Sequence, residues 1–178
     1  MTRRGGRQKG ISPPAAWWRA LLITAYMTGW RIGQILALRW EDVDLENGTA
    51  LSRAADNKGK RDMLIQLHDL ALDHLQTVRS FHVSVFPLEV DRRSLYTEFE
   101  LIQKAAGVKP HGKQFYGFHD LRRAFATMNA DRMSGDALQA LMQHKDYQTT
   151  QRYINMARQL KPAVAELFEP ALDRSAIV

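Results

Sequence analysis

Residues 115–155 read FYGFHDLRRAFATMNADRMSGDALQALMQHKDYQTTQRYIN, and this stretch carries the most informative residue spacing in the chain. His119 and Arg122 are three residues apart, so on a helix they share one face and can approach one small anion. A guanidinium offers a planar set of donors that suits phosphate oxygens, and an imidazole can accept or donate a proton near neutral pH. The pair therefore indicates phosphate chemistry.

The same stretch continues to a second histidine and a tyrosine, His144 and Tyr153. Thr149 and Thr150 are typical of a helix start, which predicts a helix with Tyr153 on its second turn and its phenol near an imidazole. Any one of these residues alone is more often a packing or surface residue than a catalytic one. The prediction of a site therefore rests on their order and spacing together.

Two helices are predicted upstream of residue 43. The first follows Ser12-Pro13-Pro14, and an apolar stripe at helical spacing is expected to face the core rather than to stack on bases. Thr28-Gly29 interrupts the pattern, and a second helix then begins with Arg31 at its N-terminal end, where a helix already attracts anions. The stripe of the first helix consists of Trp17, Trp18, Leu21, Leu22, Ala25 and Tyr26.

Residues 43–67 show the shorter period of strands. Asn47-Gly48 is a strong hairpin turn and NKGKRD, residues 57–62, is a second one, which predicts three short antiparallel strands. Two further helices are expected at about 68–79 and 91–106. The predicted fold class is mainly α with a small three-stranded antiparallel sheet (α+β).

Composition limits the possible functions. With 178 residues and 45% hydrophobic residues the chain can form one domain with a full core, and the absence of cysteine excludes disulfides, thiolate zinc sites and cysteine nucleophiles. The longest apolar run, ALLITAYM, is too short to span a bilayer, and the start lacks the apolar core of a signal peptide. A cytoplasmic protein without membrane contact is expected.

The formal net charge of +6 is unevenly distributed. Residues 1–40 carry seven basic and no acidic residues, whereas the other 138 carry a net charge of −1. A basic segment on a nearly neutral body indicates contact with a nucleic-acid backbone, although solvated disorder is an equally frequent reason for such a tail.

The ordered set H-x-x-R, a helical stretch, His and T-T-x-x-Y resembles the catalytic domain of tyrosine recombinases, the phage-integrase class. The string TGWRIGQILALRWEDVDL, residues 28–45, resembles the first catalytic box of that family, with Arg31 in the place of its first arginine. The resemblance implies the tyrosine recombinase catalytic-domain fold for residues 12–178. Residues 1–11 are then a basic flexible arm or linker remnant, and the family's N-terminal core-binding domain is expected to be absent.

The activity implied by the resemblance is site-specific cleavage and rejoining of double-stranded DNA. Tyr153 would attack a backbone phosphorus to give a 3′-phosphotyrosine, and Arg31 and Arg122 would hold the non-bridging oxygens. His119 would accept the proton of the phenol. The chain would act as a homo-oligomer, a tetramer on DNA held through its C-terminal segment.

The resemblance also assigns two further groups. Lys58, on the second hairpin, would protonate the leaving oxygen, and Lys60 is expected to be a solvated turn residue. His144 would add a hydrogen bond to the phosphate. No metal or other cofactor is expected, because two arginines can neutralise the scissile phosphate and the HxxR face lacks a second metal ligand.

Two positions depart from the family pattern. Gln34 stands where the family usually has an acidic residue, and Gln143 replaces the glycine common before the family's histidine. Glutamine can still orient a neighbour but contributes no charge. Two alternatives therefore stay open: relaxation of DNA by a type IB topoisomerase mechanism, and a non-catalytic DNA-binding relative.

Overall fold

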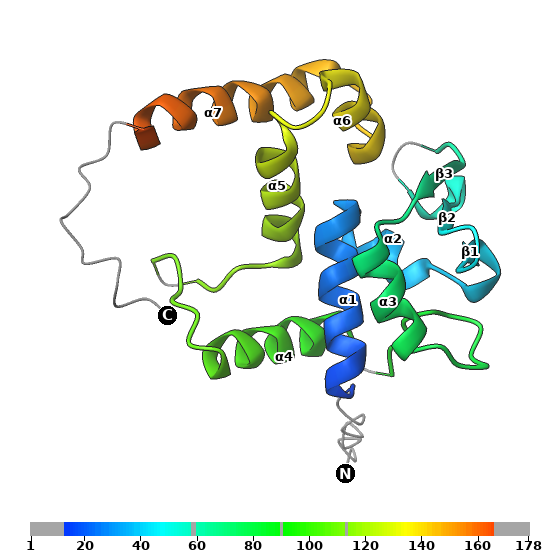
Figure 1. The fold of residues 1–178 in the computed structure, drawn as a ribbon. Coiled ribbons are helices and arrows are strands. Elements are labelled where there is room, and N and C mark those ends of the chain that lie inside the picture. Colours follow the sequence, from blue (N-terminus) through cyan, green and yellow to red (C-terminus); the bar gives the residue numbers. More distant parts are fainter. Residues whose placement is uncertain (1–12, 58–59, 90, 113, 166–178) are drawn as a thin grey trace, which may run out of the picture.

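A computed structural model of the chain describes residues 13–57, 60–89, 91–112 and 114–165, with side-chain placement as far as residue 156 (Figure 1). Seven α-helices, two short 3-10 helices (Trp40–Asp42 and Ala54–Asp56) and three strands occur within these residues, which confirms the predicted fold class. The helices are α1 (Ala15–Thr28), α2 (Ile32–Ala37), α3 (Asp69–Thr77), α4 (Arg92–Ala105), α5 (Phe118–Asn129), α6 (Gly135–Met142) and α7 (Tyr147–Ala165); the strands are β1 (Val43–Asp44), β2 (Thr49–Ser52) and β3 (Met63–Gln66).

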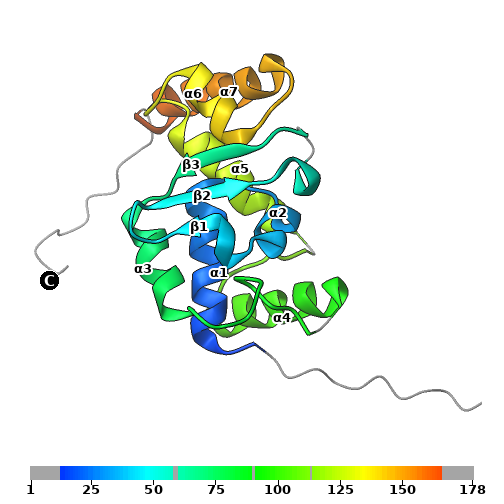
Figure 2. The ribbon, with the colours of Figure 1, turned by 90° about the vertical axis from the view of Figure 1, so that its right-hand side faces the viewer.

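Helix α1 runs through the middle of the main body and packs against α3 and α5. The aromatic stripe lies inside, as predicted: Trp17 and Trp18 are buried, and the Trp17 ring meets the ring of Phe86 edge-on at a centroid distance of 5.8 Å. Figure 2 shows the small sheet in front of α1, with α6 and α7 at one end of the molecule and α4 at the other.

The sheet has the order β1-β2-β3, and both pairs of strands are antiparallel. The first hairpin turns at Asn47-Gly48, where Gly48 has the positive φ of 68° that a tight turn requires. The Asp44 carboxylate accepts the backbone N–H of Asn47 at 2.8 Å and so closes the turn. The second hairpin carries Lys58, which lies outside the described residues.

Buried apolar side chains form two clusters. The larger one joins α1, α2, α3, α4 and the sheet, and the smaller one joins α5, α6 and α7 around Phe125, Leu138, Met142 and Ile154. The N-terminal residue of α5, Phe118, belongs to the larger cluster, whereas Phe125 on its next turns belongs to the smaller one. Helix α5 therefore connects the two, and the candidate site lies between them.

One predicted helix boundary was wrong. Helix α7 begins at Tyr147, not at Thr149-Thr150, because the Asp146 carboxylate accepts the N–H of Gln148 at 3.0 Å and so closes the first turn two residues earlier. The helices predicted at about 68–79 and 91–106 are confirmed as α3 and α4. No helix within the described part of the chain is both long and apolar enough to cross a membrane.

Candidate active site

Arg31 directly precedes α2, and its backbone N–H donates to the side-chain Oε1 of Gln34 at 3.1 Å. One guanidinium nitrogen, Nη1, is buried, and no hydrogen-bond partner is found for it among the described residues. Burial lowers the pKa of Arg31 below its ordinary value. A buried, positively charged donor without a partner is costly unless an anion binds it, so this geometry suits a phosphate oxygen.

Arg122 lies on α5 and is only 2% exposed. Its Nη1 donates to the carbonyl of Gly29 at 2.6 Å, and its Nη2 donates to the carbonyl of Met142. The guanidinium thus ties the turn between α1 and α2 to the C-terminal end of α6. A guanidinium carries five N–H donors, so two used for orientation leave others for an anion.

The two arginines are close enough to influence each other electrostatically. Burial, followed by the positive charge of Arg31, lowers the pKa of Arg122 to about 10. A negative charge on the oxygen of Tyr153 acts in the opposite direction on both arginines and stabilises their charged forms. An anion in this position would therefore be attracted by both guanidinium groups.

His144 and Tyr153 lie side by side, as the sequence predicted. Their rings are nearly parallel, with an interplanar angle of 11° and centroids 6.0 Å apart. The Nδ1 of His144 is 2.9 Å from the hydroxyl oxygen of Thr150, a fully buried residue of α7. Burial, and then the charges of Arg122 and Arg31, lower the pKa of His144 to about 4, so the imidazole is neutral at pH 7.

The remaining predicted residues are placed less completely. His119 is exposed on the first turn of α5 and, within the described part of the chain, makes no hydrogen bond to another residue of the set. Lys58 lies outside the described residues. Lys60 is exposed and has a left-handed φ of 49°, consistent with its interpretation as a solvated turn residue. The structure therefore brings together Arg31, Arg122, His144 and Tyr153.

Three supporting residues were not predicted from the sequence. Thr150, interpreted there as a helix start, instead contacts His144 from inside α7. Buried Asn57 directly precedes Lys58, and its Nδ2 donates to the carbonyls of Arg53 and Arg61, each at 2.8 Å, on the two sides of the second hairpin. Buried Ser52 accepts from both Gln34 and Asn57.

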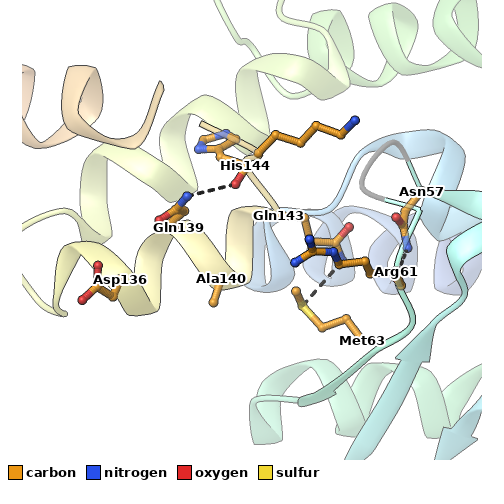
Figure 3. A pocket seen from close by; sticks show the side chains of 9 residues that line it. Asn57, Arg61, Met63, Asp136, Gln139, Ala140, Gln143 and His144 are labelled. Carbon is orange, nitrogen blue, oxygen red and sulfur yellow. Dashed lines mark hydrogen bonds between the residues drawn. The ribbon is translucent and has the colours of Figure 1, made fainter. Parts of the chain in front are cut away.

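A pocket of about 630 Å³ lies beside these residues, between the second hairpin and α6 (Figure 3). Gln143 extends into it, and Gln139 donates to the backbone carbonyl of His144 at 3.1 Å. No group of three or more potential metal-ligating side chains occurs among the residues that the structure describes. The pocket is lined by Asn57, Arg61, Met63, Asp136, Gln139, Ala140, Gln143, His144 and Lys145.

Comparison with known proteins identifies the family behind this arrangement. The model of the phage integrase family matches residues 7–159, most of the chain. The chain belongs to the phage integrase family. The match includes every residue of the proposed set from Arg31 to Tyr153. The whole ordered motif found in the sequence therefore lies inside the region that the family model covers.

Curated relatives of this phage integrase family member are tyrosine recombinases. Tyrosine recombinase XerC of Xanthomonas axonopodis pv. citri (strain 306) is 29% identical over 163 residues, which cover 88% of this chain and 52% of the relative. Tyrosine recombinase XerD of Staphylococcus aureus (strain Mu50) is 26% identical over 164 residues, which cover 85% of this chain and 54% of the relative. The chain thus spans about half the length of the curated relatives it matches.

Solved structures show that the fold is that of tyrosine recombinase catalytic domains. The XerH site-specific recombinase, solved with a palindromic difH substrate in a post-cleavage complex, matches with a TM-score of 0.67 and 24% identity over 90% of this chain and 49% of its own. A lambda integrase (75–356) dimer bound to a COC′ core site matches with a TM-score of 0.63 and 20% identity, covering 89% and 56%.

Proposed function

We propose that this chain carries the catalytic site of a site-specific DNA recombinase that cuts and rejoins duplex DNA through a 3′-phosphotyrosine. The observation that carries the proposal is the cluster of Arg31, Arg122, His144 and Tyr153, in which the buried Arg122 and the half-buried Arg31 both interact electrostatically with the oxygen of Tyr153. A phenol ordinarily loses its proton near pH 10, so cationic neighbours are needed for attack at neutral pH. The named relatives, XerC and XerD, support the assignment to strand exchange.

The reaction uses one nucleophile and one leaving group. The oxygen of Tyr153 forms a bond to phosphorus while the bond from phosphorus to the 5′ oxygen breaks, and Arg31 and Arg122 neutralise the charge of the transition state. The proton of the phenol passes to His119. Lys58 gives a proton to the 5′ oxygen as it leaves, and attack by a 5′-hydroxyl reverses the step.

His144 acts in its neutral form, because its pKa of about 4 leaves no positive charge at pH 7. The Thr150 hydroxyl engages Nδ1 at 2.9 Å, so Nε2 is the ring nitrogen left to face a phosphate oxygen, and we assign the imidazole hydrogen to Nε2. His144 therefore supplies a hydrogen bond, and the positive charge of the site comes from the arginines.

We also propose that strand exchange takes place in a tetramer of this chain on DNA. A strand can be rejoined to a new partner only when two duplexes are held together, each cut by its own protomers. A lambda integrase dimer bound to a core site is among the structural neighbours, which supports assembly on DNA. The C-terminal segment assigned to this contact, residues 166–178, lies outside the described residues.

The test is capture of the covalent intermediate. Nicked duplexes with a randomised centre are incubated with the protein, and adducts are detected on denaturing gels. Because only the nucleophilic oxygen is removed, Tyr153→Phe should abolish the adduct and leave DNA affinity little changed. Tyr147→Phe is the matched control: it lies on the same helix, it is 41% exposed, and it should form the adduct normally.

Each other outcome has its own meaning. An adduct that persists in Tyr153→Phe and disappears in Tyr147→Phe would move the nucleophile to the first turn of α7. DNA binding by the unaltered chain without any adduct would indicate a non-catalytic relative. Relaxation of supercoiled plasmid without a target site would favour a topoisomerase-like activity over strand exchange.

A further inference from the structure

The two positions that depart from the family pattern contact each other. The side-chain Nε2 of Gln34 donates to the Oε1 of Gln143 at 2.8 Å, although the two residues lie on α2 and at the end of α6. Gln34 is 4% exposed, so the hydrogen bond is shielded from water on that side. An acidic side chain at position 34 has no such donor, and a glycine at position 143 has no such acceptor.

This hydrogen bond belongs to a longer series between side chains. Gln34 Nε2 also donates to Ser52 Oγ at 3.1 Å, and Asn57 Nδ2 donates to the same oxygen at 3.3 Å. The series Gln143, Gln34, Ser52 and Asn57 thus runs from the end of α6 through α2 and β2 to the second hairpin. All but Gln143, which is half-buried, are buried.

Each end of this series is next to a proposed catalytic residue. Gln143 directly precedes His144, Asn57 directly precedes Lys58, and the Oε1 of Gln34 accepts the backbone N–H of Arg31. The segments come from distant parts of the sequence, so the position of each is fixed only by tertiary contacts. Buried side chains that hydrogen-bond to one another hold such segments in one arrangement more strictly than apolar packing does, although Oδ1 of Asn57 has no partner among the described residues.

The backbone of Gln143 indicates that its side chain has a structural role. It adopts a left-handed conformation with a φ of 51° at the C-terminal end of α6, where glycine is free of strain. Except for asparagine and aspartate, a residue with a Cβ is strained in that conformation. The side chain offsets the strain through its bond to Gln34 and a 3.7 Å contact of its Nε2 with the sulfur of Met63 (Figure 3).

We propose that Gln34 and Gln143 form a matched positioning pair, which holds Arg31, His144 and Asn57 in register in place of the acidic residue and glycine of the family pattern. This inference rests on the proposed function. Neither glutamine touches the substrate. Their effect is on the alignment of groups that do, and a displacement of about 1 Å at a reacting group can reduce a rate ~100-fold.

A double-mutant cycle tests the pair. Gln34→Met keeps the volume but cannot hydrogen-bond, and Gln143→Gly removes the acceptor while relieving the strained backbone. Each should slow single-turnover adduct formation on the nicked duplex by about tenfold or more, with DNA affinity unchanged. The double variant should be no slower than Gln34→Met. That single change already breaks the bond that Gln143→Gly removes, together with the bonds of Gln34 to Ser52 and to the Arg31 N–H.

Gln143→Asn provides the matched control. Asparagine keeps the amide and tolerates a left-handed conformation, but it is one methylene shorter and does not reach Gln34. It should therefore be as slow as Gln143→Gly. Multiplying effects in the double variant, or full activity in Gln143→Gly or Gln143→Asn, would overturn the proposal.

Thermal unfolding of the four proteins of the cycle separates this inference from the proposed function. Non-additive midpoints in the cycle would show that the Gln34 to Gln143 bond forms, whatever the chemistry. If the unaltered chain forms no adduct, the proposed function fails and the positioning role fails with it. If the adduct forms but the changes in thermal midpoint and in single-turnover rate are both additive, the proposed function stands and only the proposal of a positioning pair is wrong.

Discussion

His144 is the residue whose chemistry depends most on its surroundings. A free imidazole titrates near pH 6.5, but burial and the adjacent Arg122 and Arg31 lower the pKa of His144 to about 4. Between these two values the unfolded chain binds a proton that the folded chain does not. The free energy of unfolding must therefore fall as the pH drops from about 6.5 towards about 4.

This predicts a specific pH dependence for a variant. His144→Gln, which cannot titrate, should lose this contribution, so its thermal midpoint should change less between pH 6.5 and pH 4 than that of the unaltered chain. The measurement is thermal unfolding by circular dichroism at half-unit pH steps. Parallel curves for the two proteins would show that His144 titrates at the same pH in the folded and unfolded chain.

The turn between α1 and α2 is the element on which the site depends most directly. Gly29 ends α1 with a φ of 63°, its N–H donates to the carbonyl of Ala25 at 3.1 Å, and its own carbonyl accepts from Arg122. A Cβ added to Gly29 would lie 2.5 Å from Cδ1 of Phe125. The residue therefore has to be glycine both for its backbone conformation and for close packing against α5.

Gly29→Ala should accordingly be costly. The left-handed conformation adds about 1–2 kcal/mol and the overlap with Phe125 adds roughly 1–3 kcal/mol, so the free energy of unfolding should fall by about 2–5 kcal/mol. Urea unfolding of the variant and of the unaltered chain measures this decrease in the free energy of unfolding. Gly107→Ala is a matched control, since Gly107 has a φ of 72° but no atom within 4 Å of an added Cβ.

In the control only the conformational part should be lost, about 1–2 kcal/mol. A comparable decrease in the free energy of unfolding of the two variants would mean that α5 moves away from the turn without a loss of stability. In that case the packing of Phe125 on Gly29 would not hold the two apolar clusters together.

At the scale of the whole molecule, the distribution of charge matters more than the net charge of +6. Residues 1–40 carry seven positive charges, four of them in the basic arm, residues 1–11, while the rest of the chain has a net charge of −1. Three of the seven are described by the structure: Arg19 in α1, Arg31 directly before α2 and Arg39 just after it. The arm itself stays a prediction from sequence.

We expect the arm to bind DNA phosphates. Replacing its four basic residues by glutamine should reduce the slope of log affinity against log salt by ~0.9 for each phosphate that is no longer neutralised, and by no more than ~3.6 in total. Titration of labelled duplex at several salt concentrations measures the slope. The four residues are Arg3, Arg4, Arg7 and Lys9.

A second variant separates direct phosphate binding from general charge. Replacing Arg79, Lys104 and Lys109, which are exposed near the ends of α3 and α4, removes a similar charge from the body of the protein. Its slope should change less for each charge removed. Equal changes per charge in the two variants would mean that the arm acts only through the net charge.

The sequence alone determined the fold class and the order of the elements, and it predicted most of the residues proposed for the candidate site. Helical spacing around Trp17 and Trp18, the Asn47-Gly48 turn and the polar residues of 115–155 are local signals, because periodicity and turn preference act between near neighbours in the chain. The family resemblance then linked Arg31 to Arg122 and Tyr153. These predictions needed no knowledge of which segments meet in space.

Only the tertiary structure decided how the site is held. The buried Arg122 is held by one carbonyl from the turn after α1 and one from α6, and His144 is neutral because it is half-buried and two arginines lie near it. The bond between Gln34 and Gln143 joins segments that no local pattern connects. Burial, hydrogen-bond partners and shifted pKa values depend on what surrounds a side chain, and folding brings those surroundings from distant parts of the sequence.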